Sequence, residues 1–185
     1  QLEYRMLAGL SGVGLSKILG GYLHDADYPR ITQALTALDA LPLYMNDRCG
    51  QTATDIRVAC RRLSREQGLG LVVIDYVQLM PSALDRRGST RNEEVTDISR
   101  RLKALADECA VPVLLVSQLN RAGESRSDPR PRLSDLRESG ALEQDADIVV
   151  LLHRKNHRDG GVTNCIFEKQ RNGPTGKVKV RWESA

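Results

Sequence analysis

Aromatic residues are scarce in this sequence, where tryptophan, phenylalanine and tyrosine together make up 4% of 185 residues. Modules that read single-stranded nucleic acid by base stacking, such as OB folds and RRMs, need aromatic platforms, so the composition argues against them. Any nucleic acid would instead be held through its phosphates, without sequence preference. No apolar run is long enough to span a membrane and no signal peptide is seen. We therefore expect no membrane partner.

Paired cysteines are also missing. The four cysteines (Cys49, Cys60, Cys109 and Cys165) form no C-x-x-C pair and have no histidine partner nearby. This spacing argues against a structural zinc site and against a disulfide framework. Buried thiols in a reducing cytoplasm are the simplest interpretation, so we expect a cytoplasmic protein. The chain also opens at Gln1 without methionine, in what reads as the middle of a helix. We expect it to be a piece of a longer protein.

The formal net charge of +3 does not by itself indicate a nucleic-acid partner. The distribution of charge is more informative, because residues 154–181 carry many cations and only two acids, Asp159 and Glu168. The cations are Arg154, Lys155, Arg158, Lys169, Arg171, Lys177, Lys179 and Arg181. A basic surface of this kind suits phosphate, and a solvated basic face is the alternative.

Helix-like and strand-like segments alternate along the chain, which predicts an α/β fold with a largely parallel sheet. Helical periodicity predicts helices over 2–10, 31–41, 54–68 and 95–105, with Asp27 and Thr54 as N-caps of the second and third. Apolar runs predict strands over 43–45, 71–75, 113–116 and 147–152, those at 71–75, 113–116 and 147–152 being buried. Alternation over 162–169 and 177–182 predicts a β-hairpin joined at 170–174.

Three of the predicted buried strands end in polar residues: Asp75, Gln118 and His153. If these strands are neighbours in a parallel sheet, the three side chains share the edge where ligands bind. An aspartate after four apolar residues is typical of the Walker B position, where a rigid carboxylate lies near Mg²⁺. The alternatives without a binding function are a turn-capping aspartate at Asp75 and an ordinary loop residue at Gln118.

The usual partner of a Walker B aspartate, a G-x-x-x-x-G-K-[ST] phosphate loop, does not occur in the sequence. Residues 9–14 have the glycine spacing, but Leu15 and Ser16 follow where Lys and Ser or Thr are needed. Residues 173–177 are too short and lie in the predicted hairpin. We therefore expect residues 1–185 alone not to hydrolyse ATP.

Several segments together resemble one family, the DnaB-type replicative DNA helicases. The segments are LVVIDYVQLM at 71–80, ISRRLKALA at 98–106, VPVLLVSQLNR at 111–121, SDLRESGALEQDAD at 134–147 and EKQRNGPTG at 168–176. They follow the family's order at about its spacing, and the resemblance covers essentially the whole chain. It implies a RecA-like P-loop NTPase core in the C-terminal helicase domain, truncated before residue 1 so that the phosphate loop and the catalytic glutamate are absent.

The resemblance also implies roles for individual residues in binding ATP and Mg²⁺. Asp75 would be the Walker B aspartate on the metal, and Gln118 the polar sensor between the nucleotide and the DNA-binding loops. Lys169 and Arg171, in KQRNGP, would reach the ATP of a neighbouring subunit, with Arg171 as arginine finger. Without the resemblance, a basic hairpin tip in water would be the default reading.

The DNA-binding residues that the resemblance implies are Arg137, Glu138 and Gly140 in DLRESG, where arginine supplies charge and glycine allows close backbone approach. Further arginines that precede this motif would add to the same channel: Arg121, Arg126, Arg130 and Arg132.

The implied function is that of a hexameric motor, which couples ATP hydrolysis to translocation on single-stranded DNA and unwinding at the bacterial replication fork. Primase and a helicase loader would be further partners. Two alternatives stay open: a non-catalytic RecA-like docking module, and a RecA-type recombinase core. An upstream phosphate loop would exclude the first, and a closed ring instead of a filament would exclude the second.

Overall fold

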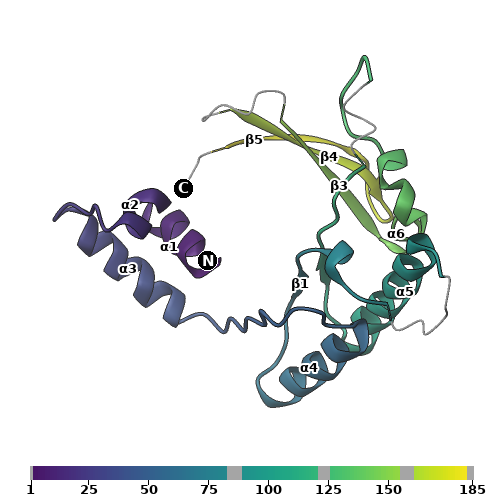
Figure 1. The fold of residues 1–185 in the computed structure, drawn as a ribbon, viewed down its shortest axis with the longest axis horizontal. Coiled ribbons are helices and arrows are strands. Elements are labelled where there is room, and N and C mark those ends of the chain that lie inside the picture. The colour runs from purple at the N-terminus through teal and green to yellow at the C-terminus, as the bar shows by residue number, and fades with distance from the viewer. Residues whose placement is uncertain (1, 83–88, 121–125, 155–160, 183–185) are drawn as a thin grey trace. The chain divides into compact units, whose positions relative to one another are not determined.

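The computed structural model describes residues 2–82, 89–120, 126–154 and 161–182 (Figure 1). By backbone contacts the chain divides into two compact units, which are described separately. One comprises residues 1–47, 155–162 and 181–185, and the other residues 48–154 and 163–180. None of the described helices is both long enough and apolar enough to cross a membrane.

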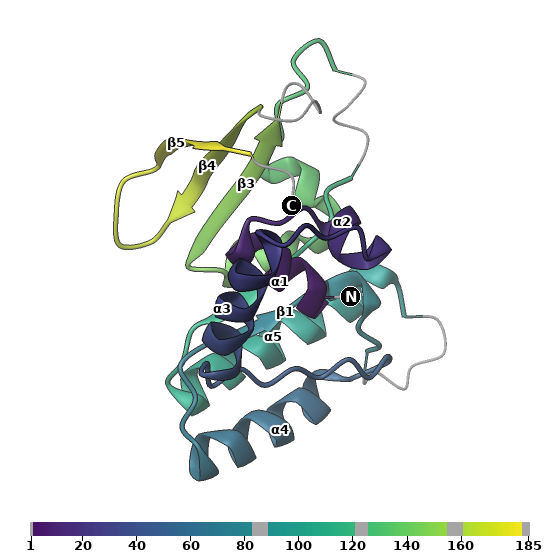
Figure 2. The ribbon, with the colours of Figure 1, turned by 90° about the vertical axis from the view of Figure 1, so that its left-hand side faces the viewer.

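The first unit contains the helices α1 (Leu2–Ser11), α2 (Leu15–Gly20) and α3 (Asp27–Asp39). Helices α1 and α3 lie side by side, and each buries small or apolar side chains, Leu7 and Ala8 from α1 and Ala34 from α3 (Figures 1 and 2). The two predicted helices of this region are confirmed. Asp27 is not the N-cap, however, because α3 already begins there and Ala26 precedes it. The strand predicted over 43–45 is also wrong, since these residues belong to no strand.

Three α-helices of the second unit pack together: α4 (Ala53–Glu66), α5 (Arg91–Cys109) and α6 (Gly140–Asp145). Thr52 caps α4 in place of the predicted Thr54, because its hydroxyl accepts from Asp55 N while the Asp55 carboxylate accepts from Thr52 N. Sequence periodicity alone does not decide which of two threonines, two residues apart, caps the helix. Thr90 and Glu93 form the same reciprocal cap at the start of α5.

Two short strands, β1 (Val72–Ile74) and β2 (Val113–Leu115), pair in parallel, with Val72 opposite Val113 and Ile74 opposite Leu115. Their location and parallel pairing agree with the prediction. Burial on both faces does not, because Val72 and Ile74 are buried while Val73 between them is 57% exposed. Successive side chains of a strand point to opposite faces, and the buried face of β1 lies on the core formed with α5.

Strands β3 (Ile148–Arg154), β4 (Val162–Gln170) and β5 (Gly176–Arg181) form a separate sheet in that order, with β3 antiparallel to β4. The hairpin prediction is confirmed, but the prediction of one mostly parallel central sheet holds only for β1 and β2. An apolar run such as 147–152 predicts a strand but not its partner, and β3 pairs with the hairpin that follows it. Within β3, Leu151 is buried whereas Leu152 is 66% exposed.

The core of the second unit is an apolar cluster between β1, α4, α5 and the turn after β1. Its most deeply buried members are Val77, Val95, Ile98 and Leu105. Val77 lies in η1 (Val77–Leu79), a single 3-10 turn directly after β1. The core therefore holds the segment on which the candidate site depends.

Candidate functional site

Asp75 and Gln118 follow two strands that the structure pairs directly. Beyond the strands the pairing continues, because Val116 N donates to Ile74 O at 2.9 Å and Val77 N donates to Val116 O at 3.0 Å. Asp75 is exposed at this edge, and its peptide bond to Tyr76 is cis. The predicted common edge is confirmed for these two strands. The prediction that His153 shares this edge is wrong, because β3 belongs to the other sheet.

The side chain of Gln78 fixes the backbone around Gln118. Its amide nitrogen donates to Ser117 Oγ at 3.0 Å and to Gln118 O at 3.2 Å, and its amide oxygen accepts from Gln118 N at 3.2 Å. Sequence reasoning missed Gln78, since a glutamine three residues after a strand carries no signal of such a contact. The amide couples the turn after β1 to the segment after β2.

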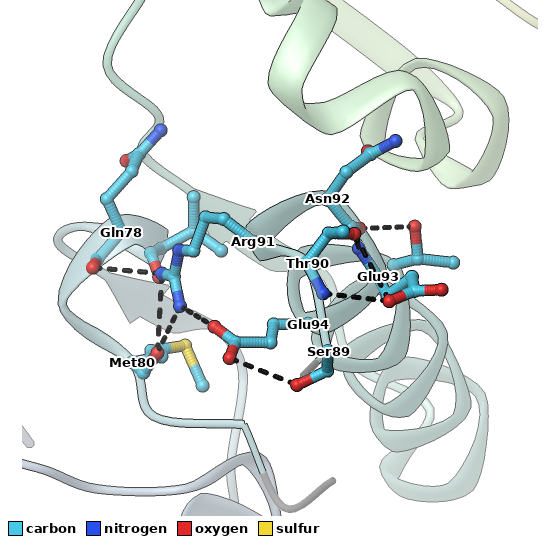
Figure 3. Close-up of polar contacts among 10 residues, drawn as sticks. Gln78, Met80, Ser89, Thr90, Arg91, Asn92, Glu93 and Glu94 are labelled. Carbon is cyan, nitrogen blue, oxygen red and sulfur yellow. Dashed lines mark hydrogen bonds and ion pairs between the residues drawn. The ribbon is translucent and has the colours of Figure 1, made fainter. Parts of the chain in front are cut away.

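Arg91, in the first turn of α5, holds the other side of this turn (Figure 3). Its guanidinium donates to the carbonyl oxygen of Gln78 at 2.9 Å and lies 3.4 Å from those of Val77 and Met80. Glu94 binds the same guanidinium at 2.7 Å. The turn between Asp75 and Met80 is therefore fastened to the start of α5, and Asp75 is presented from a fixed backbone.

The segment after Gln118 is joined to the region of the predicted DNA-binding loop. Asn120 N donates to Asp135 O at 3.0 Å, and Asp135 lies in η3 (Leu133–Ser139), a 3-10 segment that contains Arg137 and Glu138. The nearly buried Asp135 carboxylate accepts from Arg132 N at 2.8 Å and from Arg126 Nη2 at 2.6 Å. Burial alone would raise the pKa of Asp135, but these bonds and the nearby arginine charges lower it overall.

The predicted DNA-binding residues have different surroundings. Arg126 is paired with Asp135 and also donates to Arg130 O at 3.2 Å, so the structure shows it bracing the loop. Arg121 and the side chains of Arg137 and Glu138 lie outside the described residues, while Gly140 is the first residue of α6. The side chains of Arg130 and Arg132 are 65% and 58% exposed, and both lie near Asp128. The DNA-binding roles stay predictions.

Lys169 and Arg171 lie at the end of β4, where they contact the C-terminal end of α6 in the same chain. Lys169 Nζ donates to Glu143 O at 2.7 Å and to Gln144 O at 3.0 Å. Arg171 Nη2 lies 3.4 Å from Gln144 O, and its Nη1 lies 3.0 Å from Asp147 Oδ1. The Arg171 side chain is 54% exposed, so these contacts leave it at the surface and outside the core.

The residues present fit a magnesium–nucleotide site only in part. Among the described residues, no group of three or more His, Cys, Asp or Glu is placed to hold a metal ion. Mg²⁺ does not need such a group, because it keeps several waters and binds through one or two carboxylates together with substrate phosphates. The exposed Asp75 at the end of β1 meets that requirement.

Comparison with known proteins decides the family. Residues 1–185 match the family model described as the DnaB-like helicase C terminal domain. This chain belongs to that family. Replicative DNA helicase DnaB of Geobacillus stearothermophilus is 43% identical over 185 residues, and that of Leifsonia xyli subsp. xyli is 44% identical over 188. These alignments cover 97% and 99% of this chain but 40% and 41% of the relatives, so the chain spans about two fifths of their length.

Two solved structures resemble the fold of this DnaB-like domain. A structure titled as a DnaB-like replicative helicase and its interactions with primase superimposes with a TM-score of 0.90 at 33% identity, over 97% of this chain and 46% of the other. A second structure, titled as an ATPase domain, gives 0.87 at 34% identity, over 95% of this chain and 64% of the other. The α/β architecture of the domain is therefore that of DnaB-like helicase ATPase domains.

The lowered pKa of Asp135 predicts a pH-dependent contribution to the stability of this DnaB-like domain. An ionised carboxylate with a depressed folded pKa stabilises fully above its unfolded pKa of about 3.9, and this stabilisation is lost as pH falls through the folded pKa. Asp135→Asn should therefore lower the free energy of unfolding at neutral pH, with the difference from the original shrinking below about pH 4. Urea unfolding of residues 1–185 across this pH range measures the difference in the free energy of unfolding.

Asp128→Asn, at a half-exposed ion pair, is the matched control. An equal loss of stability at all pH values for Asp135→Asn would contradict the stabilising role of the ionised carboxylate.

Proposed function

We propose that this chain is part of the motor domain of a hexameric replicative DNA helicase, which couples ATP hydrolysis to movement along single-stranded DNA and to unwinding at the replication fork. Family membership supports this. The single observation that carries it is the path from the Asp75 turn, by hydrogen bonds from Gln78 to Gln118, along the chain to Asn120, and by a hydrogen bond to Asp135. That path joins the edge with Asp75 and Gln118, where the nucleotide would bind, to η3, where DNA would bind. A translocating motor requires such a link.

In this proposal ATP and Mg²⁺ lie at the edge of a RecA-like core. Asp75 would hold the metal through its waters, and Gln118 would respond to the terminal phosphate through its side-chain amide. Lys169 and Arg171 of a neighbouring subunit would neutralise charge on the transferred phosphoryl group. When bound, the metal would supply charge neutralisation on the phosphates.

Single-stranded DNA would be held in the central channel of the ring through Arg137, Glu138 and Gly140, with Arg121 and Arg126 close by. We further propose a bacterial cytoplasmic location at replication forks, with primase and a helicase loader as partners. One of the similar structures is titled with its interactions with primase, which supports the first of these partners.

Residues 1–185 alone should not hydrolyse ATP, because their sequence contains no G-x-x-x-x-G-K-[ST] loop to bind the phosphates. Phosphate release by the purified chain with Mg²⁺ and single-stranded DNA should stay at the level of a no-enzyme blank. Metal-dependent turnover that disappears in Asp75→Asn would contradict this.

Arg171→Ala in the full-length protein should lower DNA-stimulated ATP hydrolysis by about 10³-fold or more, because an arginine finger acts mainly on the transition state. Nucleotide binding should be largely kept. A mixture of Arg171→Ala and Asp75→Asn subunits should regain activity, since one kind of interface then has both residues intact. Lys179→Ala, on the exposed β5 strand of the same hairpin, is the control. Failure of the mixture to recover, in rings shown to be mixed, would exclude a role across subunits.

Arg137→Ala in the full-length protein should weaken single-stranded DNA binding at every sequence tested. The log–log dependence of affinity on salt should become shallower by about 0.7 for one lost phosphate contact. Fluorescence anisotropy across a salt series measures both. Arg62→Ala, which removes a 73% exposed cation from α4, should leave the slope unchanged. An unaltered slope for Arg137→Ala would remove Arg137 from the channel.

A further inference from the structure

Helix α6 joins the two candidate sites that the sequence places far apart. It has six residues, Gly140–Asp145, and η3 with Arg137 and Glu138 runs directly into it. At 1.5 Å per residue it is about 9 Å long. Its N-terminal end therefore carries the proposed DNA-binding segment, and its C-terminal end lies at Lys169 and Arg171.

The side chains of Lys169 and Arg171 both contact the C-terminal end of α6. The last carbonyl groups of a helix have no intrahelical partner, and here Glu143 O and Gln144 O accept from Lys169 Nζ at 2.7 and 3.0 Å. The backbone of Arg171 is held as well, because its N–H donates to Asp147 O at 2.9 Å. The position of Arg171 is thus set by the end of α6 and by Asp147, two residues beyond it.

The Asp147 carboxylate lies between two cations from different elements. Its Oδ2 lies 2.5 Å from Lys103 Nζ of α5, and its Oδ1 lies 3.0 Å from Arg171 Nη1. Hydrogen bonding from Lys103, outweighing partial burial, and the charges of Lys103, Arg171 and Lys169 lower the pKa of Asp147, so it is ionised at neutral pH.

Helix α5 provides a rigid base for this contact. Leu102 and Leu105, on either side of Lys103, are buried in the core. One turn earlier, the buried Ser99 hydroxyl donates to Asp145 Oδ2 at 2.6 Å, which fixes the last residue of α6 to the same helix. Asp147 therefore connects the Arg171 guanidinium, through Lys103, to the buried helix α5.

We propose that Asp147 is a positioning residue for Arg171: it holds the guanidinium against the end of α6 and links its placement to the DNA-binding segment at the helix's other end. This inference rests on the proposed function, in which Arg171 acts on a neighbour's nucleotide. A plain surface ion pair is the alternative. Exposed pairs contribute little to stability, so removal of the Asp147 charge leaves the fold intact and changes the direction of one side chain.

Asp147→Asn in the full-length protein keeps the shape of the side chain and removes its charge. Because misplacement by about 1 Å can cost up to about 10²-fold, DNA-stimulated kcat should fall by about 10- to 100-fold. KM for ATP and the affinity for single-stranded DNA should stay within about threefold. Lys103→Met, which removes the other fixed contact, should lower kcat in the same direction by a smaller factor. Should Asp147→Asn fail to fold, Lys103→Met carries the test.

A double substitution separates positioning from an independent effect. If Asp147 acts through Arg171, adding Asp147→Asn to Arg171→Ala lowers the rate no further than Arg171→Ala alone. The control is Asp97→Asn, which removes another carboxylate–arginine pair, Asp97 with Arg101 at 2.7 Å, from α5 itself. It should leave kcat unchanged.

The outcomes distinguish this inference from the proposed function. Only the positioning role would be overturned if DNA stimulates ATP hydrolysis by the wild type, Arg171→Ala is inactive and Asp147→Asn hydrolyses ATP at the wild-type rate. A faster Asp147→Asn, or additive losses in the double substitution, would also overturn it. No DNA-stimulated ATPase in the wild-type full-length protein would overturn the proposed function, and the inference with it.

Discussion

The pairing of two three-residue strands, β1 and β2, is the constraint on which the candidate site depends. So short a ladder contributes few hydrogen bonds, and an isolated pair of strands is marginal in water. Its position is set by the apolar layer beneath it, where Val72, Ile74 and Val77 share one buried cluster with side chains of α5. Because the same layer buries Val77 completely, the turn that follows Asp75 is anchored in the core as well.

Polar contacts then add direction to this apolar base. Arg91 donates hydrogen bonds to the carbonyl groups of the turn, and Gln78 links the turn to the backbone of Gln118. From there Asn120 reaches Asp135, whose carboxylate also holds Arg126. The steps from Gln78 to Gln118 and from Asn120 to Asp135 are hydrogen bonds between segments far apart in the sequence, and the chain itself joins Gln118 to Asn120. A contiguous set of contacts of this kind is the physical condition for energetic coupling between the Asp75 turn and η3.

Sequence periodicity predicted the elements of the site better than their partners. The apolar runs at 71–75 and 113–116 identified β1 and β2, because buried strands require them, and the motifs identified the family. The run at 147–152 looked the same, yet β3 pairs with β4, since an apolar run does not encode which strand it joins. Gln78, Asp135 and Asp147 were missed as site residues for a related reason. Their contacts depend on tertiary placement, and a lone glutamine or aspartate beside a strand has no distinctive spacing.

Lys169 and Arg171 use their charges differently. A lysine ammonium is a compact charge, and Lys169 already directs its charge at the carbonyl groups of Glu143 and Gln144. A guanidinium has five N–H donors in a fixed plane. Contacts with Asp147 and Gln144 use only some of them, and the side chain remains 54% exposed. Under the proposed function, Arg171 would stay bound to Asp147 while its remaining donors reach a neighbour's phosphate, so that contact would not require release from its own subunit.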